Sequence, residues 1–270
     1  MTTIPTRVAD RLSAGLKKFQ PIIASAKSRD VNESDTVIIV TDMLSDVFGY
    51  DKYSEITSEF AVRGTYCDLA TRVDGDLQCF IEVKSAGIEL KDNHTKQACD
   101  YAANQGVDWV VLANGAIWRV YKVTFAKPIT QELVIELDIL NMNPKRTEDL
   151  EALFLLAKEG FQKSALGDYS AQRQALSRFT IGAMLLTEPI IDMIRRELRR
   201  MCPDVKIDQE QVRTVLSQEV IKRDVLEGER ADDARKKVAR AANRALRAKA
   251  VAATNGETEA EPPQASEQGT

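Results

Sequence analysis

The sequence predicts an α/β fold in which a mixed β-sheet is flanked by helices, followed by an all-helical C-terminal region. Extended stretches near 55–62, 66–73 and 77–84 precede a helix around residue 100, and further extended stretches follow it. Helical patterns precede the first strand, and this α-β-β-β-α-β order suits a mixed sheet with helices on its faces. From residue 146 onward, apolar residues recur at helical spacing.

Four parts follow from this division. They are an N-terminal helical segment (1–29), the sheet domain (30–145), a helical region (146–250) and a polar, acidic tail (251–270). Hydrophobic residues make up 44% of the 270 residues, which is enough for a core. The tail has few apolar residues, so we expect it to be disordered.

The N-terminal part predicts two helices. The first covers residues 6–28 and is expected to break near Pro21. The second begins at Asn32, a favourable cap, with Glu33 in its first turn and Gly49 just past its end. Its apolar run VIIV favours a strand by propensity, but the caps and the helical spacing of its apolar residues favour a helix.

A hairpin between the second and third strands carries the most informative residues. Its link, Asp74-Gly75-Asp76, is a turn signal. If these three residues form the loop, counting back along an antiparallel pair places Asp68 directly opposite Glu82. The period of two along a strand then puts Glu82 and Lys84 on one face.

These three side chains suit one kind of chemistry. Two neighbouring carboxylates repel each other unless a cation lies between them. Hard oxygen ligands suit Mg²⁺, and Mg²⁺ suits phosphate chemistry. An acid followed by E-x-K also occurs by chance, and in that case the residues form a solvated hairpin.

A helix and a second hairpin follow. The helix is expected to start at Asp92 or Asn93 and to end at Gly106. Gln97 and Tyr101 are four residues apart and therefore share one of its faces. The remaining strands lie near 107–113, 116–123 and 131–138, the first two joined by an N-G turn.

Taken together, these elements resemble a known family. The stretch DLATRVDGDLQCFIEVKSAG, followed by KQACDYAANQGVDWVVLANGAIWRVYKV, is similar to the N-terminal nuclease domain of type I restriction enzyme R subunits, a PD-(D/E)-x-K nuclease domain. Members have an acid in one strand, E-V-K in the next, Q-x-x-x-Y in the following helix, and an N-G turn ending in W-x-V-Y. With an acid-bearing helix upstream, the resemblance covers about residues 30–125 and implies a restriction-endonuclease-like fold.

For the site, the resemblance implies a metal centre on the hairpin. Asp68, Glu82 and the carbonyl of Val83 would bind one or two Mg²⁺ ions, for which Mn²⁺ can substitute. Lys84 would orient or help to deprotonate the attacking water and stabilise charge on the phosphate. Glu33 would be an outer ligand or would position water.

The family motif also gives roles to the helix after the hairpin. Gln97 and Tyr101 would support the metal ligands or contact the DNA backbone. The alternative is that both pack at the edge of the core and tie the helix to the sheet. The sequence departs from the family at Cys67, where a proline often precedes the first acid, and it has no G-x-x-x-x-G-K-[ST] loop. We therefore expect no ATP-driven translocation by this chain.

The resulting hypothesis is a metal-dependent endonuclease that hydrolyses DNA phosphodiester bonds. Two alternatives stay open: a catalytically silent DNA-binding or assembly protein on the same fold, and a nuclease directed at RNA. Other restriction or defence subunits are further expected partners. No signal peptide and no membrane-spanning apolar run are visible in the sequence, so a cytoplasmic location is expected.

Charge and cysteine content narrow these hypotheses. A net charge of −4 excludes a basic DNA-coating protein but allows a local basic groove. Candidate phosphate contacts, each of which could also be a solvated charge, are Arg63, Lys91, Lys96, Arg119 and Lys122. The four cysteines have no C-x-x-C spacing, so no zinc site is expected. Cys67 and Cys79 are predicted as core residues on the face opposite Asp68 and Glu82, and His94 as polar surface.

The helical region has no chemical motif. Its first helix is expected over the amphipathic stretch TEDLEALFLLAKEGF, another restarts at Thr187-Glu188-Pro189, and Asp208 caps a third. Excess apolar surface is provided by Ile190, Ile191, Ile194 and Leu198. This surface predicts either a symmetric homodimer or packing onto the nuclease domain of the same chain. Near the end, a helical stripe of Arg240, Arg244 and Arg247 is either a phosphate or acidic-partner contact or a solvated face.

Overall fold

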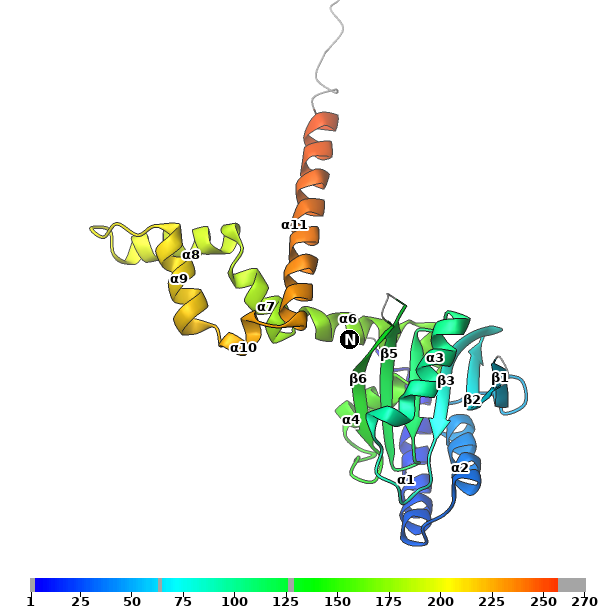
Figure 1. The fold of residues 1–270 in the computed structure, drawn as a ribbon. Helices are drawn as coiled ribbons and strands as arrows, with labels where there is room; N and C mark the ends of the chain where they lie inside the picture. The colour runs from blue at the N-terminus through cyan, green and yellow to red at the C-terminus, as the bar shows by residue number, and fades with distance from the viewer. Residues whose placement is uncertain (1–2, 63–64, 126–128, 257–270) are drawn as a thin grey trace, which may run out of the picture. The chain divides into compact units, whose positions relative to one another are not determined.

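The computed structural model describes residues 3–62, 65–125 and 129–256 (Figure 1). Its contacts divide the chain into two compact units, Met1–Ser170 and Ala171–Thr270. The first unit is a mixed α/β unit and the second is helical, as the sequence predicts at this level. Within the described residues, no helix combines the length and the apolar character needed to cross a membrane.

The first unit is built around a six-stranded sheet whose strand order follows the sequence. The strands are β1 (Ile56–Val62), β2 (Thr65–Val73), β3 (Asp76–Val83), β4 (Trp109–Ala113), β5 (Ile117–Thr124) and β6 (Thr130–Asp138). Strands β3 and β4 are parallel, and every other neighbouring pair is antiparallel. A parallel pair needs a long crossover, which helix α3 (Lys96–Gln105) supplies between β3 and β4.

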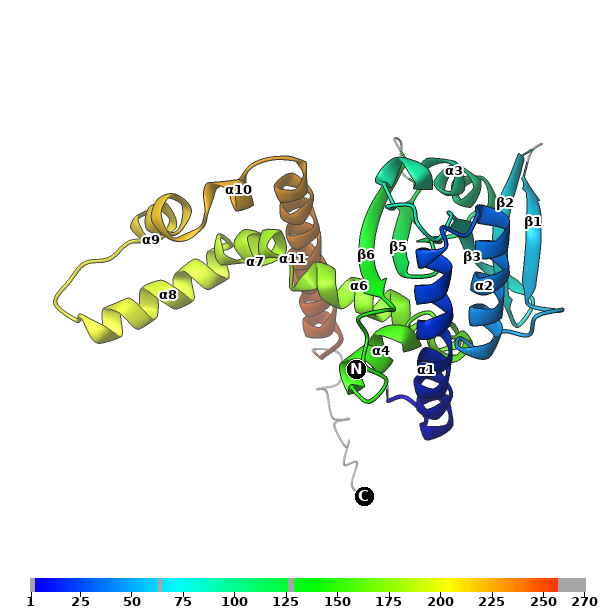
Figure 2. The ribbon, with the colours of Figure 1, turned by 90° about the horizontal axis from the view of Figure 1, so that it is seen from below.

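Helices cover both faces of this sheet. Helix α1 (Thr6–Ser28) and helix α2 (Glu33–Asp46) lie on one face and α3 on the other (Figures 1 and 2). Two hydrophobic clusters result, the first between the sheet and α1 and α2, the second between the sheet and α3. The largest fully buried side chain is that of Trp118, in the first cluster.

The predicted break near Pro21 is wrong, because α1 runs through it without interruption. The proline is exposed, so the carbonyl that loses its helical partner lies on the solvent side. The opposite face of the helix is anchored in the first cluster by Leu16, Phe19 and Ile23. Packing on that face holds the helix together across the proline.

The prediction for α2 is confirmed. The side chain of Asn32 accepts a hydrogen bond from the backbone N–H of Asp35 at 2.9 Å, which caps the helix. Val40 and Leu44 are buried in the first cluster, so the VIIV run is helical despite its strand propensity. Gly49 follows the helix with φ of 84°, a conformation that suits glycine.

Beyond the sheet, the chain departs from the expected single helix over TEDLEALFLLAKEGF. Helix α4 (Thr147–Phe154) ends at a turn, and α5 (Lys158–Gln162) and α6 (Ala165–Ala175) follow. The turn residues Leu155, Leu156 and Ala157 pack into the first cluster together with Phe154. Because these apolar residues complete the core of the sheet unit, that unit extends to Ser170 rather than to the predicted boundary at 145.

The second unit has its own small core. Its helices are α7 (Arg178–Leu185), α8 (Glu188–Met201), α9 (Gln209–Val215), the π-helical η2 (Leu216–Val220), α10 (Arg223–Leu226) and α11 (Glu229–Gly256). Asp208 caps α9 as predicted, since its side chain accepts from the N–H of Gln211 at 2.8 Å. The predicted tail begins too early, because residues 251–256 continue α11; residues 257–270 lie outside the described part.

The apolar residues of α8 are divided between this core and the surface. Ile191 is fully buried in a cluster with Val212 and Val225. Ile190 and Ile194 are half-buried, and Leu198 is 36% exposed. Part of the apolar surface predicted for a dimer is therefore used inside this unit.

Candidate functional site

The hairpin that carries the candidate residues has a shorter turn than the sequence predicts. Val73 pairs with Asp76, so the loop consists of Asp74 and Gly75 alone. Both loop residues have positive φ, 53° and 90°, as a two-residue hairpin turn requires. The expected three-residue loop is wrong because Asp76 belongs to β3.

A bulge restores the predicted register further along the hairpin. The pairing shifts between Thr71 and Arg72, so that one extra residue is accommodated in β3. From there to the pair Leu69–Ile81, the partners are the ones that a three-residue loop would have given. One further step in the same register would set Asp68 opposite Glu82, but the pairing of the two strands ends at Leu69–Ile81.

Beyond the last backbone pair of β2 and β3, a side-chain hydrogen bond connects the two strands. The backbone pairing of β2 with β3 ends at Leu69–Ile81. Beyond it, the N–H of Val83 donates a hydrogen bond of 2.7 Å to Oδ2 of Asp68. The Asp68 carboxylate is thus fixed against the residue between Glu82 and Lys84.

Lys84 connects two of the three acids directly. Its Nζ lies 2.8 Å from Oε1 of Glu82 and 3.3 Å from Oε2 of Glu33. Its backbone N–H donates to the carbonyl of Ala113 at 2.8 Å, which extends the parallel pairing of β3 with β4. The four predicted catalytic side chains are therefore gathered at one end of β3.

Glu33 belongs to α2, which covers the face of the sheet opposite α3, and it reaches the end of β3 from there. The N–H of Ala86 donates to the carbonyl of Val31 at 3.2 Å, which joins the start of α2 to the chain just after β3. Since Asn32 starts the helix there, Glu33 in its first turn can pair with Lys84. The acid of the upstream helix was predicted, and this backbone contact explains its position.

Asn114 supports the same end of the sheet and was interpreted from the sequence only as a turn residue. Its Oδ1 accepts from the N–H groups of Ala116 and Ile117, as a turn asparagine does. Its Nδ2, however, donates to the carbonyl of Ile88 at 2.8 Å, and the side chain is buried. Asn114 therefore holds the segment that follows Lys84. In the sequence, the N-G turn was the only feature that drew attention to this residue.

Burial and like charge shape the electrostatics of the site. Burial raises the pKa of the Asp68 carboxyl, and the charge of Glu33 adds to this, against the N–H of Val83 and the charge of Lys84. Burial also raises the pKa of Glu82, with the hydrogen bond from Lys84 acting against it. Burial alone would lower the pKa of Lys84, but the hydrogen bond to Glu82 and the nearby carboxylates outweigh it and raise this pKa. Lys84 is therefore a cation at neutral pH.

The oxygen atoms present fit a hard divalent cation. Asp68, Glu82 and Glu33 each have one carboxylate oxygen in a hydrogen bond or ion pair, and the other has no such partner among the described residues. In that part of the chain, no three His, Cys, Asp or Glu side chains lie close enough together to hold a metal ion between them. Mg²⁺ commonly uses only one or two carboxylates and completes its shell with water and phosphate oxygens.

The backbone of Val83 can add to this set. Its N–H points toward Asp68, and both backbone groups of a strand residue point toward the same neighbouring strand. We therefore expect its carbonyl to lie on the side of Asp68, as the predicted ligand role requires.

Helix α3 follows the hairpin, and the resemblance predicted roles for its residues Tyr101 and Gln97. Tyr101 is buried in the second cluster, 5% exposed, which corresponds to the packing alternative. Gln97 belongs to α3, and its side chain lies outside the described part. The predicted start at Asp92 or Asn93 is wrong, because a 3₁₀ turn, η1 (Asp92–Thr95), comes first and α3 begins at Lys96.

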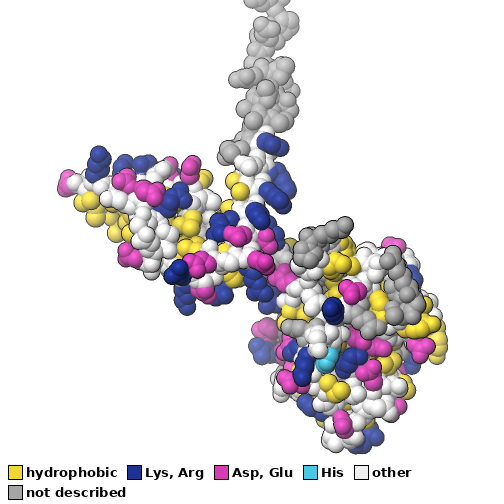
Figure 3. All heavy atoms as spheres, in the orientation of Figure 1, with side chains coloured by type: hydrophobic (Ala, Val, Ile, Leu, Met, Phe, Trp, Pro, Cys, Tyr) yellow, Lys and Arg dark blue, Asp and Glu magenta, His cyan; other side chains and the backbone are white. Residues whose placement is uncertain are grey.

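The candidate phosphate contacts that the structure describes have different surroundings. Arg119 pairs with Glu136 at 2.5 Å and donates to the carbonyl of Leu90 at 2.7 Å. The Nζ of Lys122 lies 5.5 Å from the ring centre of Trp109. The other candidates are Lys91 and Lys96, which are exposed, and Arg63, which lies outside the described residues. On the face visible in Figure 3, acidic and basic side chains of this unit are mixed.

The cysteines are free and mostly buried. Cys79 packs in the first cluster, on the face predicted for it. Cys67 packs in the second cluster with Phe80, so the predicted face is wrong for this residue. The alternation fails where the pairing of β2 and β3 ends. His94 accepts a hydrogen bond at Nδ1 from the N–H of Lys91 at 3.3 Å, a local turn contact.

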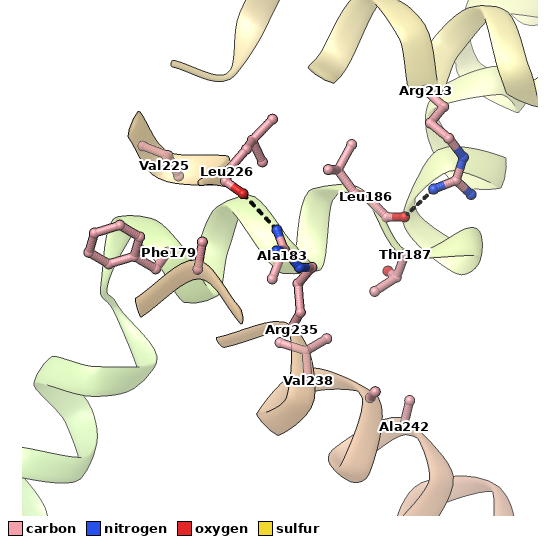
Figure 4. Close-up of a pocket in the computed structure, with 12 residues that line it drawn as sticks. Phe179, Ala183, Leu186, Thr187, Arg213, Val225, Leu226, Arg235, Val238 and Ala242 are labelled. Carbon is pink, nitrogen blue, oxygen red and sulfur yellow. Dashed lines mark hydrogen bonds between the residues drawn. The ribbon is translucent and has the colours of Figure 1, made fainter. Parts of the chain in front are cut away.

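The helical unit contains a separate pocket of about 300 Å³ (Figure 4). Its walls are mainly apolar, and most of them come from α7, α10 and α11. Two arginines line it, but Arg213 donates to the carbonyl of Leu186 and Arg235 to that of Leu226. Because these contacts tie helices together, we do not take the pocket as the functional site.

Comparisons with known proteins do not add to this geometry. No family model, no curated protein and no solved structure matches the chain.

Proposed function

We propose that this chain is a Mg²⁺-dependent endonuclease that hydrolyses DNA phosphodiester bonds without ATP. The observation that supports it is that Glu82 and Glu33 both pair with Lys84 at one end of β3, where Asp68 accepts from the N–H of the adjacent Val83. Three carboxylates and one ammonium leave two negative charges, which one divalent cation would balance. The resemblance to the nuclease domain of type I restriction enzyme R subunits gives the same residues the same roles.

Each residue of the site has a separate role in the proposed reaction. Asp68, Glu82 and the carbonyl of Val83 would hold the ion, which would supply a Lewis acid for the phosphate and a more acidic water. Lys84 is charged at neutral pH, so we assign it to orient the attacking water and to stabilise negative charge on the phosphate. Glu33 pairs with the ammonium of Lys84. It would also position water near the ion.

One observation favours the alternative of a catalytically silent binding or assembly protein. Lys84 already has two carboxylate partners, so the ion pairs are complete without a metal. Such a network can serve stability alone. The two hypotheses differ in whether Mg²⁺ binds at the site and whether cleavage follows.

The deciding experiment compares Mg²⁺-dependent cleavage by the wild type and by Glu82→Ala. Wild-type protein should cut plasmid DNA with Mg²⁺ or Mn²⁺ and without ATP, and EDTA should stop it. Glu82→Ala should lose this activity because a metal ligand is missing. Glu55→Ala is the matched control, since Glu55 is a similarly shielded, ion-paired acid, 2.5 Å from Lys158, away from the site.

Each outcome separates the hypotheses. Cleavage that Glu82→Ala retains would assign the activity to another site or a contaminant. Absence of cleavage with both metals, on DNA and on RNA, would favour the binding or assembly protein. Cleavage of RNA alone would support the RNA-directed nuclease.

A further inference from the structure

Helix α11 has an unusual distribution of charge along its length. Between Ala234 and Gly256 it has no Asp or Glu. The same stretch contains Arg235, Lys236, Lys237, Arg240, Arg244, Arg247 and Lys249. The charge of this stretch is therefore not compensated within it.

Most of these cations lie on one side of the helix. At about 100° per residue, five of them fall within an arc of about 100°. They are Lys236, Lys237, Arg240, Arg244 and Arg247, which we call the α11 stripe. Figure 3 shows Lys and Arg side chains along this helix. All five are exposed.

The opposite side of α11 is used for packing within its own unit. Ala231 and Ala234 are buried, 2% and 4% exposed. Val238 and Ala242 line the pocket next to α7 (Figure 4). Small residues thus attach the helix to its neighbours and turn the stripe away from them.

The stripe keeps most of its charge available. Among the described residues, Arg240, Arg244 and Arg247 take part in no ion pair or hydrogen bond. Lys236 has only a long contact of 3.9 Å with Asp233, and Lys237 donates to the uncharged amide of Gln174. The surface therefore fits a partner with regularly spaced negative charge.

We propose that the α11 stripe binds the phosphate backbone of a nucleic acid. From its first to its last residue the stripe measures about 17 Å, and phosphates of one duplex strand recur every 3.4 Å or so along the axis. Between Lys236 and Arg247, the sequence places only the five cations and Asn243 within or next to the arc of the stripe, so this side of the helix has no bulky apolar residue to insert into a membrane. The choice of nucleic acid rests on the proposed function, but the binding does not require cleavage.

The test measures binding in EDTA, where a metal-dependent nuclease cannot cut. Fluorescence anisotropy of a labelled 30-base-pair DNA is followed against salt for the wild type and the triple variant Arg240→Ala, Arg244→Ala, Arg247→Ala. Each lost phosphate contact should reduce the slope of log K against log salt by about 0.9, so the triple variant should lose about 2.7. Alanine preserves helix propensity, and circular dichroism checks that the fold is kept.

A charge-matched control isolates the stripe from net charge. Arg196→Ala, Arg200→Ala, Arg223→Ala removes three exposed cations of the same unit that lie outside the stripe. This control should keep the wild-type slope. An equal loss in both triple variants, an unchanged slope in the stripe variant, or no binding by the wild type would each overturn the proposal.

Further measurements identify the kind of partner and distinguish this proposal from the proposed nuclease activity. Binding of the wild type to phosphatidylserine vesicles but not to DNA or RNA would overturn the choice of nucleic acid. Stripe-dependent binding without any Mg²⁺-dependent cleavage would support this inference while the proposed nuclease failed. Mg²⁺-dependent cleavage together with DNA binding that does not depend on the stripe would support the nuclease and overturn this inference.

Discussion

Replacing Lys84 by methionine tests the centre of the proposed site. The change removes the ammonium that lies 2.8 Å from Glu82 and 3.3 Å from Glu33, while a side chain of similar length remains. Activity should fall by a factor on the order of 10²–10³, the cost of removing one positioned electrostatic group. This corresponds to about 3–4 kcal/mol of transition-state stabilisation.

Stability should fall as well, and mainly through Glu82. Its side chain is 11% exposed and would lose its charged donor, which typically costs about 1.5–3 kcal/mol. The contact with Glu33 adds little, because that side chain is 46% exposed. We therefore expect the free energy of unfolding to fall by about 2 kcal/mol near neutral pH.

The pH dependence of this loss has a definite sign. Burial already raises the pKa of Glu82, and removing Lys84 should raise it further. A carboxyl whose pKa is higher in the folded protein binds its proton more tightly there, so stability increases as pH falls through that pKa. The stability deficit of Lys84→Met should therefore shrink between neutral pH and about pH 5.

The assays are urea unfolding at two pH values and plasmid cleavage with Mg²⁺. Lys52→Met serves as the control, because it removes a lysine whose pair with Asp42 is solvent-exposed, and it should leave both measurements unchanged. Full activity in Lys84→Met would refute the assignment of Lys84. A stability deficit that grew with acid would refute the electrostatic argument.

Three further predictions concern the fold and assembly. Glu159 has a lowered pKa, mainly through its hydrogen bond with Arg11, so this pair stabilises the protein above about pH 4.5 and the effect disappears as pH falls through the lowered pKa. In urea unfolding, Arg11→Met should cost about 1 kcal/mol near neutral pH and less in acid. Gly49→Ala should destabilise more than Gly75→Ala: both have positive φ, but only at Gly49 would the new Cβ meet the Arg11 guanidinium, and similar midpoints would contradict this. If α8 forms a symmetric dimer, Met201→Glu, at a residue 77% exposed, should yield a monomer by light scattering, and a wild-type monomer at high micromolar concentration would eliminate the dimer.

Local patterns in the sequence were sufficient for much of the fold and for part of the site. The cap at Asn32 and the apolar spacing after it predicted α2 correctly against strand propensity. The two-residue period placed Glu82 and Lys84 together, and their 2.8 Å contact follows from it. Caps and alternation depend on residues a few positions apart, so the sequence alone displays them.

Only the tertiary structure decided the features that depend on distant parts of the chain. Glu33 and Lys84 are 51 positions apart, and they meet because the backbone after β3 bonds to the start of α2. The bulge in the hairpin compensates for the shorter turn, and no local sequence pattern predicted this bulge. Tyr101 is buried, and α1 passes through Pro21, because packing of their neighbours outweighs local preference. Such outcomes are set by which surfaces are buried together, and this depends on the whole unit rather than on any one segment.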